Sequence, residues 1–139
     1  MRRLYIILFL TVVFFGCHDV TIGYLKADEA EYDPATLTVR TVLDPEEDEL
    51  RIANDANWVS PKIQGVLGTN PLIYTLENVT ATEGGDAEAF RKEVIVRGAG
   101  VMELPLYTKV PKGNYLVSVR VSNEGYSAVI EDAFTFIVE

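Results

Sequence analysis

Cysteine, histidine and basic residues are scarce in this chain of 139 residues, and each scarcity excludes a class of function. The one cysteine is Cys17 and the one histidine is His18, so we expect no internal disulfide, no histidine-based zinc site and no Ser/His/Asp or Cys/His catalytic site in the body of the chain. Lys and Arg number 12 against 21 Asp and Glu, which gives a net charge of −9. Nucleic-acid binding needs a basic surface, so we expect no nucleic-acid partner.

The longest apolar run is also short. It covers residues 4–15, is interrupted only by Thr11, and follows Arg2 and Arg3. A membrane-spanning helix needs about 20 apolar residues. A basic head, a short apolar middle and a small residue, Gly16, are instead typical of an export signal.

Because Cys17 directly follows Gly16, this segment resembles a bacterial lipoprotein signal. The resemblance implies cleavage after residue 16, a diacylglycerol on the sulfur of Cys17, and a fatty acid such as palmitate on its amino group. We therefore expect a lipid-anchored protein of the bacterial cell envelope, in the outer membrane, with the leaflet left open. A plain secretory signal is the alternative, because Phe14 and Phe15 depart from the usual lipoprotein pattern.

The rest of the chain predicts strands almost throughout. Residues 116–122 alternate, with Val117, Val119 and Val121 on one face, and this period of two is the signature of a strand. Glycine-, proline- and asparagine-rich turns separate the segments. One stretch, residues 86–92, is compatible with a short helix. Further strands are predicted at residues 37–43, 62–67, 72–82, 93–97, 101–106 and 133–138.

About seven short strands without a disulfide predict an all-β, antiparallel sandwich. Gly113-Asn114-Tyr115 precedes the most regular strand and is similar to the tyrosine corner of immunoglobulin-like domains of the cadherin and fibronectin type. The resemblance covers residues 36–139, leaves residues 17–35 as the lipidated cysteine and its tether, and implies that the hydroxyl of Tyr115 bonds backwards to the backbone. An edge strand at residues 20–25 is an alternative to a tether there. A short exported lead before such a domain resembles small accessory lipoproteins of surface glycan-uptake systems.

Two runs rich in oxygen ligands are candidates for a metal site. Asp44 and Asp48 lie in one, and Asp55 and Asn57 lie in the other. Carboxylate and amide oxygens suit calcium, which is the one cofactor that the sequence suggests. Solvated charges and ordinary turns are the more common use of such runs.

Aromatic residues in polar surroundings are the candidates for ligand binding. Trp58, Tyr107 and Tyr126 fit this description, and flat side chains stack on the apolar faces of sugars. Trp58 is the strongest candidate for an exposed platform. Its alternative is a place in the core, where a single tryptophan of a small domain is usually found.

These features favour a non-enzymatic binding or scaffold module of the cell envelope. Its partners would be the membrane, through Cys17, and a glycan or another envelope protein. A structural or adhesive subunit that assembles through an exposed sheet edge is a second hypothesis. A glycosidase based on two carboxylates is a remote third, because 21 acidic residues supply carboxylate pairs by chance.

Overall fold

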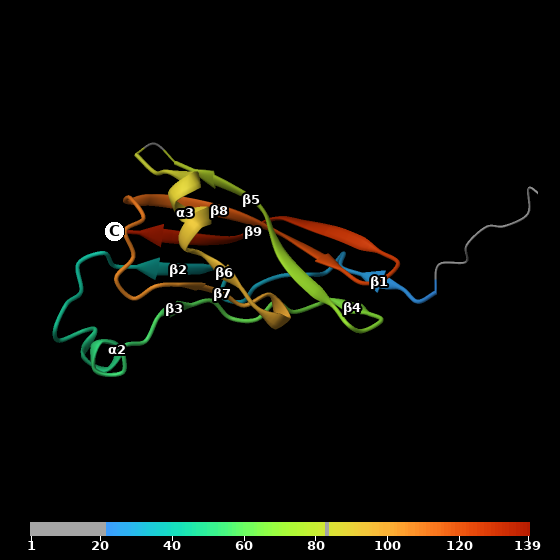
Figure 1. The fold of residues 1–139 in the computed structure, drawn as a ribbon, viewed down its shortest axis with the longest axis horizontal. Helices are drawn as coiled ribbons and strands as arrows, with labels where there is room; N and C mark the ends of the chain where they lie inside the picture. Colours follow the sequence, from blue (N-terminus) through green and yellow to red (C-terminus); the bar gives the residue numbers. More distant parts are fainter. Residues whose placement is uncertain (1–21, 83) are drawn as a thin grey trace, which may run out of the picture.

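The computed structural model describes residues 22–82 and 84–139, so the predicted signal peptide and the lipidation site Cys17 lie outside the described residues. The protein is an all-β fold with several sheets (Figure 1). The largest sheet has four strands in the order β2-β9-β8-β5, and its long central hairpin joins β8 (Gly113–Ser122) to β9 (Ser127–Val138). The outer strands are β2 (Thr36–Val39) and β5 (Ile73–Ala81).

Alternation explains the core face of this sheet. Val117, Val119 and Val121 of β8 are fully buried, as the period of two predicts. Phe134 and Phe136 of β9 lie on the same side and their rings meet edge to face, with centroids 4.9 Å apart. Val117, Val119, Phe134 and Phe136 belong to one apolar core.

Two smaller sheets complete the fold. β7 (Met102–Leu104) lies between β3 (Trp58–Val59) and β6 (Ile95–Val96), and β1 (Leu25–Lys26) pairs with β4 (Leu67–Gly68). Met102 and Leu104 are fully buried and belong to the same core as the four-stranded sheet. The two larger sheets therefore share one interior.

One strand at the edge of the four-stranded sheet runs in a direction that the sequence did not predict. β2 runs parallel to β9, with Leu37 opposite Phe136, whereas the other strand pairs of the described residues are antiparallel. The expectation of a purely antiparallel sheet is therefore wrong here. A tight hairpin would force the antiparallel direction, but a long stretch of chain separates β2 from β9 and leaves either direction open.

The N-terminal segment packs onto the domain earlier than predicted. Leu25 pairs with Gly68, Glu31 forms a bridge with Gln64, and Tyr32 is buried against Phe134. The boundary of the folded domain therefore lies near residue 24 and not at residue 36, and the described part of the predicted tether is mostly ordered structure. Of the described residues in the edge strand considered as the alternative, only Leu25 lies in a strand, because β1 covers Leu25–Lys26 and pairs with β4 outside the larger sheets.

Helices are short in the described part of the chain. α3 (Ala87–Glu93) lies where the sequence predicts a helix, and the side chain of Asp86 caps it by accepting from the backbone N–H groups of Glu88 and Ala89. α2 (Glu49–Ala53) was not predicted, and η2 (Gly98–Gly100) is a single 3-10 turn. None of these helices is long and apolar enough to cross a membrane.

Tyr115 connects β8 to the rest of the fold. Its ring is fully buried and stacks on Phe90 of α3, with centroids 4.8 Å apart. Its hydroxyl donates to the carbonyl oxygen of Pro111 at 2.7 Å, four residues upstream, and accepts from the N–H of Asp86 at 3.1 Å. The first of these bonds has the backward direction expected of a tyrosine corner.

Candidate functional site

Trp58 does not form an exposed platform. Only 3% of its surface is accessible, because β3 pairs with β7 and places Trp58 opposite Leu104 in the core. Its ring N–H donates to the carbonyl oxygen of Leu106 at 3.2 Å, and the guanidinium of Arg51 lies 4.1 Å from the ring centroid. The prediction of a sugar-stacking surface at Trp58 is therefore wrong.

The other two aromatic candidates are exposed but lie in separate parts of the fold. Tyr107 is 63% accessible and belongs to the connection between β7 and β8, at the end of the molecule that holds the C-terminus in Figure 1. Tyr126 is 40% accessible and belongs to the turn between β8 and β9, at the opposite end. The structure therefore does not combine Trp58, Tyr107 and Tyr126 into one surface.

The first predicted calcium run forms a closed network of its own, which we call the acidic loop (residues 40–58). The guanidinium of Arg40 donates two hydrogen bonds to the carboxylate of Asp48, which is 2% accessible. The same carboxylate accepts from the backbone N–H of Asp44 at 2.9 Å. The hydrogen bonds from Arg40 lower the pKa of Asp48, and burial opposes this effect.

Two of the remaining candidate ligands, Asp44 and Asn57, are also held by hydrogen bonds within the protein. The carboxylate of Asp44 accepts from the backbone N–H groups of Glu46 and Glu47 at 2.8 and 3.2 Å. The side chain of Asn57 donates to the carboxylate of Glu103 at 2.6 Å and accepts from the N–H of Leu106 at 3.0 Å. Asp55 sits at a positive φ of 49°, which is typical of a turn.

A calcium site at Asp44, Asp48, Asp55 and Asn57 is not formed. Within residues 22–82 and 84–139, no group of three or more His, Cys, Asp or Glu side chains has the arrangement of a metal site. The carboxylates of Asp44 and Asp48 instead bind Arg40 and the backbone of the same loop, and the side-chain oxygen of Asn57 binds the backbone of Leu106.

A polar depression lies instead on the four-stranded sheet, where three neighbouring strands lose their regular register together. Between β5 and β8 the pairing shifts so that Glu77 has no partner opposite it, and Asn78 pairs with Ser118. Between β8 and β9 the pairing jumps from Val117 and Phe134 to Val119 and Ile130, so Ser118 also faces an extended bulge in β9. Bulges of this kind bend strands and redirect side chains, and they occur often beside functional sites.

We call this feature the bulge depression. Its volume is about 350 Å³, within the range of small-ligand pockets. Every strand that contributes to it carries one of the irregularities just described. Its lining residues are Glu77, Asn78, Ser118, Val129, Glu131 and Asp132.

Arginines fix one wall of the bulge depression. Arg120 donates two hydrogen bonds of 2.8 Å to the carboxylate of Glu77, and these bonds lower the pKa of that carboxyl group. Arg91 of α3 donates to the side-chain oxygen of Asn78 at 3.2 Å. This wall is therefore held in place before any ligand arrives.

The opposite wall presents carboxylates to solvent. The hydroxyl oxygen of Ser118 accepts from the backbone N–H of Asp132 at 3.0 Å, and Asp132 adopts a positive φ of 48°. Glu131 and Asp132 are both exposed. Among the described residues, no side-chain hydrogen bond or ion pair engages either carboxylate, so both can accept hydrogen bonds from a ligand.

Two breaks in the alternating pattern of the sequence indicate the bulge depression, although the strand prediction did not use them. Alternation breaks at Glu77-Asn78 and again at Glu131-Asp132, where two polar residues follow one another inside otherwise regular strands. Such a break is the expected trace of a bulge, because the extra residue shifts which side chains face the core.

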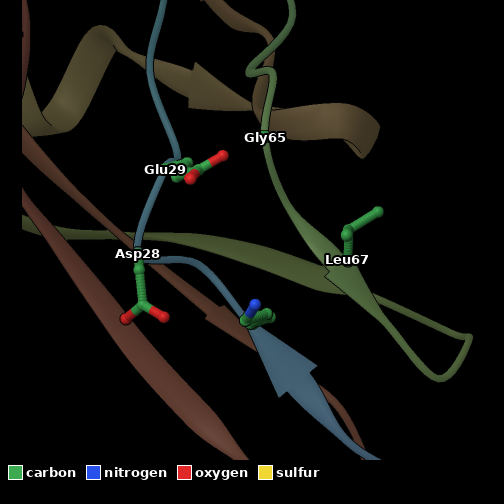
Figure 2. A pocket seen from close by; sticks show the side chains of 5 residues that line it. Asp28, Glu29, Gly65 and Leu67 are labelled. Carbon is green, nitrogen blue, oxygen red and sulfur yellow. The ribbon is translucent and has the colours of Figure 1, made fainter.

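A second and smaller cavity lies beside the N-terminal segment. Figure 2 shows Asp28 and Glu29 on one side of it and the segment from Gly65 to Leu67 on the other. Its volume is about 100 Å³, well below the usual size of a ligand pocket. Gly65 is required there, because a Cβ atom would lie 2.1 Å from the carbonyl oxygen of Glu29. The cavity therefore results from the close contact between two chain segments.

Comparison of the chain with protein-family models, with curated proteins and with solved structures finds no match.

Proposed function

We propose that this protein is a non-enzymatic, lipid-anchored binding module of the bacterial cell envelope, and that the bulge depression is its ligand site. The observation that carries the proposal is the coincidence of two bulges, in β5 and in β9, on either side of β8 around a polar cavity. The anchor follows from the apolar run before Gly16-Cys17. Mass spectrometry of the mature N-terminus tests the anchor, because acylation adds a defined mass that a Cys17→Ser variant lacks.

We also infer that the domain is an immunoglobulin-like sandwich. The backward hydrogen bond of Tyr115 and the shared core of the two larger sheets support this inference. The fold by itself does not specify a ligand.

The chemistry of the bulge depression favours a ligand that donates several hydrogen bonds. Two solvent-facing carboxylates, Glu131 and Asp132, supply acceptors, and the side chain of Asn78 adds an amide beside them. Val129 contributes a small apolar area to the same cavity. A glycan presents several hydroxyl donors and short apolar faces, so it is the ligand class that we propose.

Catalysis receives less support than binding. A general acid based on a carboxyl group needs a raised pKa, whereas hydrogen bonds from arginine lower the pKa values of Asp48 and Glu77. We therefore retain the non-enzymatic interpretation and place the glycosidase hypothesis last.

Assembly through sheet edges also receives less support. The three-stranded sheet ends in strands of two residues, β3 and β6, and short edges pair poorly with another chain. The longer edge strand β5 has α3 and η2 packed beside it. Binding in the bulge depression therefore remains the leading proposal.

A glycan array followed by isothermal titration calorimetry tests the ligand site. We expect the Glu131→Gln and Asp132→Asn variants to bind about tenfold more weakly or worse, because each loses a charge-assisted hydrogen bond of about 1.5–3 kcal/mol. Glu46→Gln is the matched control, because it removes one exposed charge from the acidic loop. Equal binding by all three variants would place the glycan elsewhere, and a folded protein that binds no glycan would contradict the proposed ligand class.

A further inference from the structure

Three chain segments meet at the end of the molecule where the described chain begins. They are residues 22–26, the turn at residues 67–73 and the turn at residues 122–127, and together we call them the N-proximal tip (Figure 1). The N–H of Thr69 donates to the carbonyl oxygen of Tyr24 at 3.0 Å, and the N–H of Tyr24 donates to the hydroxyl of Thr69 at 3.1 Å. The tip is therefore a hydrogen-bonded unit.

Asn123 holds all three segments together. Its side-chain amide donates to the carbonyl oxygens of Tyr24 and Thr69 at 2.8 and 3.2 Å. Its side-chain oxygen accepts from the N–H groups of Gly125 and Tyr126. Such a network fixes the tip in one shape before it meets any partner.

The surface of the tip is apolar and close to neutral. Its three segments carry one lysine, Lys26, and one glutamate, Glu124, in a chain whose net charge is −9. Exposed apolar side chains gather there, and a concentration of this kind marks an interaction surface. These side chains are Ile22, Tyr24, Leu67, Ile73 and Tyr126.

The short segment between Cys17 and the tip limits how far the tip can lie from the proposed lipid anchor. Five peptide units join Cys17 to Ile22, which span about 18 Å at most when fully extended. Acyl chains on Cys17 would insert in the hydrocarbon core, beneath an interfacial layer about 5–8 Å deep. The tip then has little room to leave the membrane surface.

The distribution of charge between the two ends of the molecule agrees with a tip that faces the membrane. The acidic loop, with Asp44, Glu46 and Glu49, lies at the opposite end of the molecule from β1 and the β8–β9 turn (Figure 1). Asp28 and Glu29 lie beside the tip, but the acidic loop carries more carboxylates, so an anionic membrane surface would repel that end more strongly than the tip. Tyrosine side chains are also enriched at membrane interfaces, where the ring is apolar and the hydroxyl stays hydrated.

We propose that the N-proximal tip docks in the headgroup region of the membrane that holds the anchor, with Tyr24 and Tyr126 at the interface. This proposal rests on the lipid anchor proposed above. Docking would fix the orientation of the domain and turn the acidic loop away from the bilayer.

Spin labelling of the lipidated protein in vesicles of phosphatidylethanolamine and phosphatidylglycerol tests the proposal. If the sulfur of Cys17 carries lipid, a cysteine introduced elsewhere is the only free thiol in the chain. Tyr24→Cys, Leu67→Cys and Tyr126→Cys place labels on the tip, and Tyr107→Cys places a matched label on an exposed tyrosine at the other end. The measurement is the collision rate of each label with oxygen and with a water-soluble nickel chelate, after circular dichroism has shown that each variant is folded.

We expect nickel collisions at the three tip labels to fall several-fold in vesicles relative to detergent-free, unlipidated protein in which Cys17→Ser removes the second thiol, while the label at residue 107 changes little. Equal nickel access at the tip and at residue 107 would overturn the docking proposal. Low access at the tip without vesicles, together with spin–spin broadening, would place a second copy of the chain there and overturn it too. Labelling of two thiols per chain would show that Cys17 lacks lipid, and the anchor would then fail together with the docking that depends on it.

Discussion

The acidic loop and the bulge depression are both rich in carboxylates, and both contain an arginine–carboxylate pair, yet they use these groups in opposite ways. In the acidic loop the carboxylate of Asp48 is 2% accessible and is bound by Arg40 and by the backbone. In the bulge depression the Arg120–Glu77 pair is partly exposed, and Glu131 and Asp132 face solvent. Burial therefore separates acids that hold the chain together from acids that a ligand can reach.

The largest expected effect comes from Trp58, the last residue of the acidic loop, whose ring lies beneath Arg40 and Arg51. Trp58→Ala removes a buried ring and its contact with Arg51, so we expect the free energy of unfolding to fall by about 3–5 kcal/mol. Urea denaturation followed by circular dichroism measures this change. A loss below about 1 kcal/mol would indicate that the ring is on the surface after all.

The pair at Asp48 should give the next largest effect and a characteristic pH dependence. The pKa of Asp48 in the folded protein lies below its ordinary value of 3.8, so the ionised carboxylate stabilises the fold above that value. This stabilisation is lost as the pH falls through the folded pKa. Asp48→Asn should therefore be less stable than the natural protein near neutral pH.

The difference between the two proteins should shrink in acid, between about pH 5 and pH 2. Thermal melts across that range measure it, with Glu46→Gln as a control that removes an exposed charge from the same loop. A constant difference at every pH would show that the ion pair is not the source of the stabilisation.

A smaller effect is expected at Ser118, which lies opposite both bulges. Ser118→Ala removes the acceptor of the Asp132 N–H bond, which we expect to lower the free energy of unfolding by about 1 kcal/mol. The bulge in β9 should also loosen, so ligand affinity should fall although Ser118 offers a ligand little surface. Hydrogen exchange at the amide of residue 132 checks the local opening, and unchanged exchange there would contradict this role.

The smallest effect on stability is expected at Asp132. Glycine tolerates the positive φ of 48° at this position, but it loses more entropy on folding than other residues. The relief of backbone strain and the entropy cost of glycine should nearly cancel. We therefore expect Asp132→Gly to change the free energy of unfolding by less than about 0.5 kcal/mol. Loss of glycan binding at unchanged stability would sharpen the contrast with Asp48, whereas marked destabilisation would make Asp132 a structural acid as well.

Sequence reasoning found the regular elements because their signal is local. Alternation located the core of β8 and the closing strand β9, and the helix-compatible stretch at residues 86–92 located α3. Local pattern failed for β1 and β3, which are strands of two residues. Strands this short depend on pairing with a strand distant in the sequence, which is β4 for β1 and β7 for β3.

The sequence also could not separate the two acid-rich regions. Asp44 and Asp48 lie in a run of charges that is typical of solvated surface. Asp48 is nevertheless buried, and its carboxylate is bound by Arg40. Trp58 has polar neighbours in the chain, yet pairing with β7 buries it. The sequence around a residue does not show that the residue is buried when the atoms that cover it come from a distant part of the chain.

By itself the sequence determined the all-β character of the chain and its acidic charge, and it predicts an export signal before Cys17, because composition and periodicity act within a few residues of one another. Only the tertiary structure decided which carboxylates remain free, which aromatic rings reach the surface, and that two bulges align into one depression. Each of these outcomes depends on strand register and on contacts between distant segments, and a shift of one residue in register moves every side chain of a strand to the other face.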